Sequence, residues 1–230
     1  MNYSMKNLSN PFHKIGIHLK TEPIRLFQQN SYLAKKYLKV IQGRDISPLL
    51  IGWICERDSF FAYMYKRMKK EAREHRTTEL AADIAQAGFP IMLPEINKWI
   101  LKSTQPILIV PVPSRHGISE RFAVELHKML DKNSRKVSEV KEIFERSDKV
   151  LEVKKIRSWG ERSRAVKNLF SFVKKEKLDQ KSVLLIDDII TSGSSLRKLA
   201  KLLKSHGTKN IAAISLATNL FDSFSYRPTK

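Results

Sequence analysis

The stretch Ser182-Val-Leu-Leu-Ile-Asp-Asp-Ile-Ile-Thr-Ser-Gly-Ser-Ser-Leu196 decides the fold of this chain. It opens with an apolar run, Val183 to Ile186, which is typical of a strand buried on both faces in a parallel sheet. Two carboxylates follow, Asp187 and Asp188, and a loop of small residues then leads into a helical pattern that ends at Ser205. This order predicts a strand–loop–helix unit that begins a right-handed parallel crossover.

The loop between the acidic pair and the helix suits a phosphate group. Small residues let backbone N–H groups converge on an anion, and the helix N-terminus adds a partial positive charge. The two carboxylates can each accept hydrogen bonds from vicinal hydroxyls. The stretch therefore predicts a ribose 5-phosphate site, and the alternative is a strand, a solvated acidic pair and a serine-rich helix cap. The loop residues are Thr191, Ser192, Gly193, Ser194 and Ser195.

The run from Val183 to Ser195 resembles the phosphoribosyl-pyrophosphate (PRPP) signature of the type I phosphoribosyltransferases. The resemblance implies that Asp187 and Asp188 are the catalytic pair that holds the ribose hydroxyls, and that residues 191–195 bind the 5-phosphate. Where 6-oxopurine salvage enzymes of this family carry an Asp, this chain has Thr191. The loop is more similar to the orotate, amidotransferase and ComF types, and the chain is too short to carry the glutaminase domain of an amidotransferase.

A second apolar run, Pro106 to Val112, predicts another buried strand. The basic turn that follows should face the acidic pair, because ligands of open α/β sheets sit at the carboxyl ends of strands. This region resembles ComF-type proteins at Pro111-Val112-Pro113, Arg115 and Arg121-Phe122. The Gly and Asn that these proteins usually carry near the last pair are absent. The resemblance implies that Ser114 and Arg115 bind pyrophosphate. The alternative is a surface turn with a solvated arginine.

The basic stretch from Ser147 to Gly160 predicts a mobile lid. Glu161-Arg162, Val166 and Phe170 resemble a ComF-type pattern, with Ala165 in place of the usual Asn. In that family a flexible loop at this place covers the reaction centre, which implies lid roles for three cations. These are Lys155, Arg157 and Arg162.

The predicted fold class is α/β, resembling the type I phosphoribosyltransferases, with a mainly parallel sheet flanked by helices. We expect a core over residues 105–230 and a mostly helical N-terminal accessory region over residues 1–104. The helical patterns span 31–41, 59–86, 94–101, 119–130 and 194–205, and Gly88-Phe89-Pro90 is expected to end the longest. Further strands are expected at 138–145, 169–173 and 210–218.

Lys and Arg number 43 against 23 Asp and Glu, for a net charge of +20. Such a charge fits a polyanionic partner, either substrate phosphates or nucleic acid, or simply a lysine-rich surface. The helix expected at 59–86 has a basic face, which likewise could contact substrate phosphates, bind nucleic acid or simply be solvated. Its cations are Lys66, Arg67, Lys69, Lys70, Arg73 and Arg76.

Cys55 is the only cysteine, so the sequence predicts neither a disulfide framework nor the N-terminal zinc finger of ComF-type proteins. No apolar run reaches membrane-spanning length and no signal peptide is evident, so we expect a cytoplasmic protein without a membrane partner.

The leading hypothesis is a PRPP-binding phosphoribosyltransferase that releases pyrophosphate to an unidentified nucleophilic acceptor. Mg²⁺ would be held mainly by the substrate, with no direct metal ligand in the protein. Two alternatives are a catalytically silent PRPP- or nucleotide-sensing protein and a DNA-uptake accessory protein on the same fold. The oligomeric state is left open, with a homodimer among the options.

Overall fold

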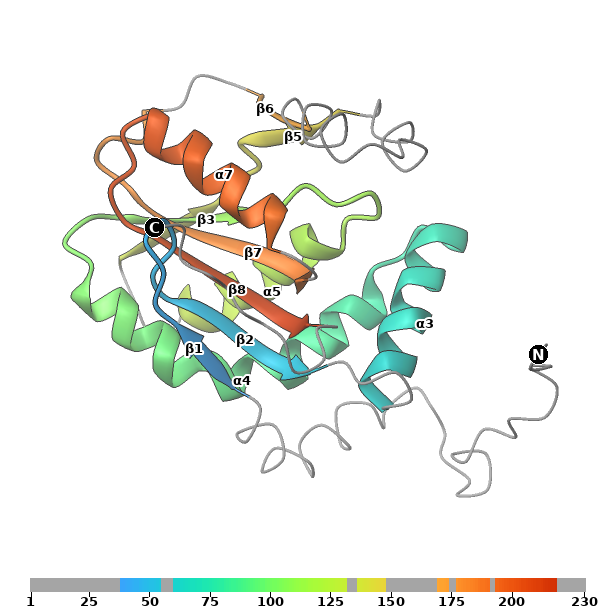
Figure 1. The fold of residues 1–230 in the computed structure, drawn as a ribbon. Helices are drawn as coiled ribbons and strands as arrows, with labels where there is room; N and C mark the ends of the chain where they lie inside the picture. Colours follow the sequence, from blue (N-terminus) through green and yellow to red (C-terminus); the bar gives the residue numbers. More distant parts are fainter. Residues whose placement is uncertain are drawn as a thin grey trace, which may run out of the picture.

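A six-stranded sheet forms the centre of the protein, with the strand order β1-β2-β8-β7-β3-β4 (Figure 1). The computed structural model describes residues 38–54, 60–131, 136–147, 169–173, 177–190 and 193–218. Strand β1 runs antiparallel to β2, and the other neighbouring pairs of this sheet are parallel. The strands are β1 Lys39–Ile41, β2 Leu49–Ile54, β3 Ile107–Pro111, β4 Val137–Val140, β7 Ser182–Ile190 and β8 Ile211–Thr218.

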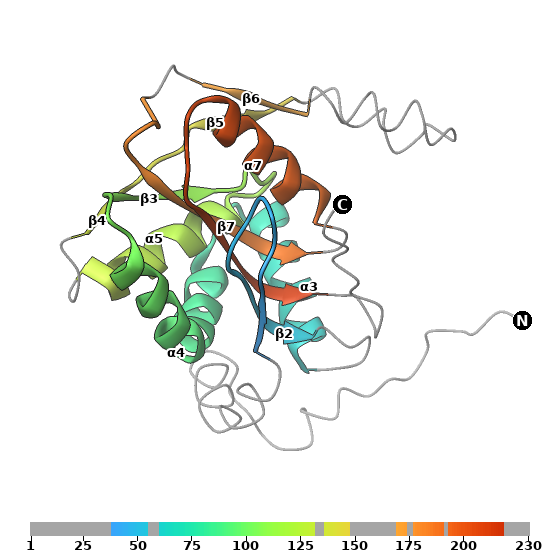
Figure 2. The ribbon, with the colours of Figure 1, turned by 60° about the vertical axis from the view of Figure 1, so that its left-hand side comes forward.

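In the described part of the chain, helices lie against both faces of this sheet (Figures 1 and 2). Buried side chains of α3, α4 and α5 belong to one hydrophobic cluster, and those of α7 belong to the other. A small antiparallel pair of strands, β5 Phe144–Arg146 and β6 Phe170–Phe172, packs with α7 on the second face. The helices are α3 Phe60–Glu74, α4 Glu79–Lys102, α5 Ile118–Asp131 and α7 Ser194–Ser205.

Strand β7 lies between β3 and β8, so both of its edges are hydrogen-bonded and both of its faces are covered. Its side chains alternate between the faces, as the twofold period of a strand requires. Leu184 and Ile186 join the cluster under α3, α4 and α5. Val183 and Leu185 join the cluster under α7. Asp187 and Asp188 continue this alternation and therefore point to opposite faces.

The chain leaves β3 and β7 in opposite directions. Strand β3 connects through α5 to β4 on one side, and β7 connects through α7 to β8 on the other. The carboxyl ends of β3 and β7 therefore meet at a point where the topology switches direction, which is where open α/β sheets form their ligand crevice.

The structure confirms the predicted fold class, because the central sheet is mainly parallel and flanked by helices. Strands β1 and β2, from the N-terminal side of the boundary expected at residue 104, belong to the same sheet as the strands from its other side. No helix in the described ranges has the combination of length and apolar character that a membrane crossing requires.

The prediction that Gly88-Phe89-Pro90 ends a helix is wrong. Helix α4 continues through Pro90 and Pro94 to Lys102. A proline inside a helix costs about 3 kcal/mol. Here both prolines are exposed, while the opposite side of the helix buries large apolar residues such as Phe89 and Met92. Burial of one such side chain contributes about 1.5–3 kcal/mol, so the packed face offsets the cost.

Three other local predictions are wrong. The helix expected over 59–86 is two helices, broken at residues 75–78, where Arg76 has a φ of 52°. Residues 39–41 form strand β1 instead of continuing a helix. The strand expected over 138–145 is two short strands, β4 and β5, which lie in different sheets.

We expect Leu199→Ala to destabilise the fold by about 2–5 kcal/mol, because this α7 side chain is 0% exposed within its cluster. Leu101→Ala is the matched control, since Leu101 is 75% exposed on α4 and should change stability by less than about 0.5 kcal/mol. Urea unfolding of both variants measures the difference. Equal losses in the two variants would contradict the placement of α7.

Candidate active site

A pocket of about 360 Å³ lies at the carboxyl ends of β3 and β7. It occupies the topological switch point, and side chains from both faces of the sheet reach it. Strand β7 and the start of α7 contribute one part of its lining, the turn after β3 contributes another, and α3, β5 and β6 close its rim. The polar and charged lining residues are Lys69, Ser114, Arg115, His116, Arg146, Asp187, Asp188 and Ser195.

The acidic pair lies within β7, because the strand extends beyond the predicted apolar run as far as Ile190. The backbone N–H of Asp188 donates to Asp187 Oδ1 at 3.0 Å. The backbone N–H of Ile189 donates to Asp188 Oδ1 at 2.7 Å. Both side chains are half-buried and line the pocket. The pairing of β7 with both neighbours therefore fixes the positions of the two carboxylates.

Helix α3 supplies partners for Asp188. The Tyr65 hydroxyl donates to Asp188 Oδ2 at 2.8 Å, across 123 residues of sequence. The Lys69 ammonium lies 3.4 Å from the same oxygen. Asp188 thus faces a hydroxyl and a cation on the α3 side of the sheet, as the alternation along β7 requires.

The pKa of Asp187 is raised well above its usual range, first by burial and then by the neighbouring Asp188 carboxylate. Lys69 acts in the opposite direction and lowers this pKa. Because two adjacent carboxylates resist ionising together, the pair retains a proton more readily than two isolated aspartates would.

The predicted phosphate loop is described from Gly193 onward, and Thr191 and Ser192 lie outside the described residues. Gly193 has a φ of +68° and occupies the N-cap position of α7. It offers no side chain to bond the first N–H groups of the helix, and the first turn of α7 contains no acidic residue. Ser195 lines the pocket, while Ser194 is exposed and accepts a hydrogen bond of 3.4 Å from Arg197. The amino end of α7 is therefore suited to an anion.

The turn after β3 lies beside the acidic pair, as predicted. The backbone N–H of Val112 donates to Ile186 O at 2.8 Å, which ties the turn to β7. Arg115 and His116 both line the pocket, and Arg115 is exposed.

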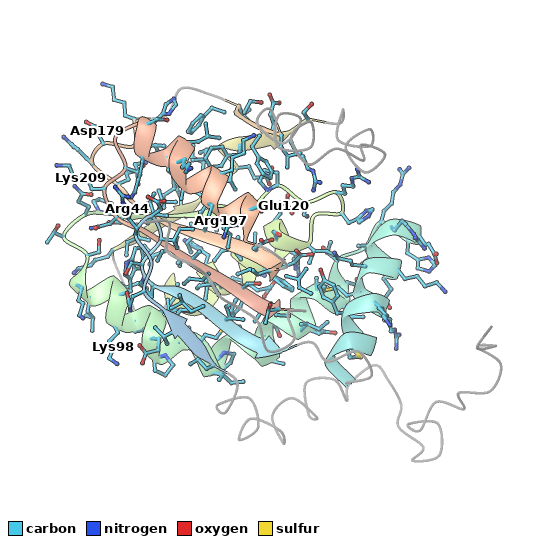
Figure 3. All side chains as sticks on the ribbon, in the orientation of Figure 1. Arg44, Lys98, Glu120, Asp179, Arg197 and Lys209 are labelled. Atoms are coloured by element: carbon cyan, nitrogen blue, oxygen red, sulfur yellow. The ribbon has the colours of Figure 1, made fainter. Side chains whose placement is uncertain are left out.

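Ser114 is already engaged by Glu120, which belongs to the first turn of α5. Glu120 is labelled in Figure 3. Its backbone N–H donates to Glu120 Oε1 at 3.0 Å, and its hydroxyl donates to Glu120 Oε2 at 2.6 Å. The Ser114 oxygen also accepts from the Ile118 N–H at 3.0 Å. An anion that bound Ser114 through these two donors would have to displace a carboxylate.

Arg121 and Phe122, which carried part of the resemblance, both lie on α5. The Phe122 ring meets Phe89 of α4 edge to face, with centroids 6.0 Å apart. The Arg121 guanidinium lies 3.1 Å from the buried Glu125 carboxylate within α5, and that carboxylate also accepts a 3.0 Å hydrogen bond from Gln86 of α4. Phe122 therefore packs α5 against α4 directly, and Arg121 pairs with the carboxylate that joins the two helices.

Tyr65, Arg146 and Phe170 are pocket or near-pocket residues that the sequence did not assign to the site. Arg146 and Phe170 are paired across β5 and β6, and both line the pocket. Phe170 is part of the ComF-type pattern noted in the sequence, but no local motif marks Tyr65 or Arg146, since each reaches the site through a long-range contact. The predicted lid residues Lys155, Arg157 and Arg162 lie outside the described residues, so their role stays a prediction.

The basic face of α3 is partly neutralised on the helix itself. Arg67 pairs with Glu71 at 3.3 Å, and Arg73 pairs with Glu74 at 2.8 Å. Lys70 lies 3.8 Å from Glu74. Exposed ion pairs of this kind contribute little to stability and leave the helix only modestly cationic, so nucleic-acid binding by this face stays a prediction.

The phosphoribosyl transferase domain model matches residues 92–223, which is more than half of the chain. The chain therefore belongs to the phosphoribosyl transferase domain family. Competence protein F of Haemophilus influenzae is 40% identical over 58 residues, a stretch that spans 25% of this chain and 25% of that protein. The family match and this relative confirm the ComF-like resemblance.

Among solved structures, the hypoxanthine-guanine phosphoribosyltransferase of Schistosoma mansoni in complex with IMP aligns with a TM-score of 0.34 and 15% identity. The alignment covers 62% of this chain and 67% of that chain.

We expect Asp187→Asn to stabilise the protein increasingly as the pH rises above about 4. Because the folded-state pKa of Asp187 is raised, the folded protein holds a proton that the unfolded chain releases, and the wild type loses stability through this interval. Asparagine carries no such penalty. Thermal melts at a series of pH values test this, with the exposed Asp179→Asn as the matched control. A loss of stability in Asp187→Asn at neutral pH would contradict it.

Proposed function

We propose that this chain binds PRPP and transfers its phosphoribosyl group to a nucleophilic acceptor, with release of pyrophosphate. The observation that carries the proposal is a single pocket that brings together the acidic pair of β7, the cationic turn after β3 and the amino end of α7. Ligands of open α/β sheets bind at such a switch point. Membership of the phosphoribosyl transferase domain family supports the same function.

The acidic pair would bind the sugar. Asp187 and Asp188 project toward opposite faces of β7 but border the same pocket, so each can accept a hydrogen bond from one of two vicinal hydroxyls. A sugar bound in this way would place its anomeric carbon near two carboxylates. Their negative charge would favour a cationic transition state over the neutral ground state.

Two groups of donors would bind the anionic ends of PRPP. The 5-phosphate would sit at the amino end of α7, against Gly193 to Ser195 and the preceding Thr191 and Ser192. The pyrophosphate would sit at the turn after β3, where Arg115 provides a guanidinium for its oxygens. Ser114 could contribute only after Glu120 has released it.

The reaction would break the bond between the anomeric carbon and the pyrophosphate oxygen, which leaves with the bonding electron pair. A lone pair of the acceptor would form the new bond to that carbon, and the acceptor would lose a proton. The protein would contribute mainly position and charge, since it forms no covalent bond to the sugar.

Mg²⁺ held by the substrate would neutralise pyrophosphate charge as it develops. The donor set fits a substrate-held ion. Asp187 and Asp188 are the two carboxylates that line the pocket, and within the described ranges no three His, Cys, Asp or Glu residues gather into a metal site.

We expect calorimetry to detect binding of PRPP with Mg²⁺ to the wild-type chain, and binding at least about 100-fold weaker in the Asp187→Asn/Asp188→Asn variant. Each substitution removes a charged acceptor from the sugar. Absence of binding by the folded wild type would overturn the proposed function. Binding without acceptor-dependent pyrophosphate release, across a screen of bases and amines, would favour a sensing protein.

One contact favours that alternative, a PRPP- or nucleotide-sensing protein without turnover. The Glu120 carboxylate occupies both donors of Ser114 and adds negative charge at the place proposed for pyrophosphate. An enzyme that used Ser114 to bind pyrophosphate would have to separate this pair in each catalytic cycle.

We expect Glu120→Gln to raise the affinity for pyrophosphate with Mg²⁺ by roughly tenfold, because it removes the competing charge but keeps an amide oxygen for Ser114. Arg115→Ala should lower the same affinity. Glu142→Gln, an exposed position between β4 and β5, is the control. Unchanged affinity in both Glu120→Gln and Arg115→Ala would place pyrophosphate elsewhere.

A further inference from the structure

Helix α3 lies outside the matched segment 92–223, yet two of its side chains contact Asp188 of the acidic pair directly. Tyr65 is 9% exposed, and its hydroxyl donates to Asp188 Oδ2 at 2.8 Å. The Lys69 ammonium lies 3.4 Å from the same oxygen and 4.7 Å from the centre of the Tyr65 ring. The three side chains therefore form one connected group.

This group limits what Asp188 can still bind. A carboxylate offers about four acceptor positions. The Tyr65 hydroxyl donates to Oδ2, the Lys69 ammonium lies within ion-pair distance of the same oxygen, and the backbone N–H of Ile189 donates to Oδ1 at 2.7 Å. These contacts restrict the directions from which a ligand can approach the carboxylate. Asp188 is thus oriented before a sugar arrives, which lowers the ordering cost of binding.

Anchoring α3 to the sheet does not require this polar group. Met64, Met68 and Ala72 lie on the buried side of α3, with exposures of 0%, 2% and 7%, and belong to the cluster beneath it. The Lys69 side chain is instead 44% exposed and lines the pocket. A cation that borders the pocket and contacts its carboxylate is placed to affect a ligand as well as the fold.

We propose that Tyr65 and Lys69 are positioning residues of the sugar-phosphate site, which hold the Asp188 carboxylate oriented for a ribose hydroxyl. The inference rests on the proposed function. It makes α3 part of the binding site, so the segment that matches the family model does not contain the whole site.

Lys69 lowers the pKa of Asp187, the neighbour of Asp188 in the acidic pair. Removing Lys69 should therefore let the pair keep its proton to a higher pH, and binding that needs ionised carboxylates should begin at a higher pH. The other charged or titratable groups that line the pocket are Arg115 and His116 from the β3–α5 turn and Arg146 from β5. These three are common to all the variants below and do not contribute to the difference.

The experiment is calorimetric titration of PRPP with Mg²⁺ into the full chain from about pH 5 to 9, for the wild type and four variants. Tyr65→Phe removes only the hydroxyl, Lys69→Met removes the cation, and Lys69→Arg keeps a cation. Lys70→Met is the matched control, because Lys70 is the next residue of α3, is 67% exposed and pairs with Glu74. Thermal melts establish that each variant folds.

We expect affinity at neutral pH to fall roughly tenfold in Lys69→Met and several-fold in Tyr65→Phe, with little change in Lys69→Arg and Lys70→Met. On the acid side of the profile, the pH at which binding begins should rise more in Lys69→Met than in any of the other three variants. If the wild type binds PRPP and Lys69→Met matches Lys70→Met in both affinity and pH profile, the positioning role is wrong while the proposed function stands. If the folded wild type does not bind PRPP, the proposed function fails and this inference fails with it.

Discussion

The parallel pairing of β3 with β7 is the interaction on which the site depends. Its register sets Pro111 opposite Ile186, and the hydrogen bond from Val112 N–H to Ile186 O continues the pairing one step beyond β3. The turn after β3 and the acidic pair of β7 are therefore neighbours before any ligand binds. Because the chain then departs toward α5 on one face and α7 on the other, the two strand ends enclose a pocket instead of being covered. A slip of one residue would exchange the faces of Asp187 and Asp188.

The alternation along β7 gives two adjacent carboxylates different surroundings. Asp188 meets the hydroxyl and the ammonium of α3. Asp187 lies on the α7 face, where burial and its charged neighbour raise its pKa. The pair is therefore costly to ionise in the folded protein. A ligand that brings hydroxyl donors would offset part of that cost, so the carboxylate pair that weakens the fold also suits the pocket to a sugar.

The sequence was informative where structure is local and less so where it depends on distant contacts. The apolar run of β7, the amphipathic pattern of α7 and the buried strand β3 predicted the elements that build the pocket, because burial on both faces and a helical period are visible in a short window. The prolines of α4 led to the wrong prediction that a helix ends there. The buried apolar residues on the opposite face of α4 stabilise the helix enough to continue through both prolines. The contact of Tyr65 with Asp188 spans 123 residues, and no motif in a single sequence reveals it. The role of Glu120 was missed for a different reason: it lies only six residues from Ser114, but an acidic residue in the first turn of a helix is common without any functional role.

We propose that this pocket holds a ribose phosphate between the acidic pair and the amino end of α7. A crystal structure of the full chain grown with ribose 5-phosphate would test this placement. We expect two sugar hydroxyls within hydrogen-bonding distance of the Asp187 and Asp188 carboxylates, and the phosphate against the backbone N–H groups of residues 193–195. A sugar phosphate bound at another place, or a well-ordered pocket that stays empty at saturating ligand, would contradict it.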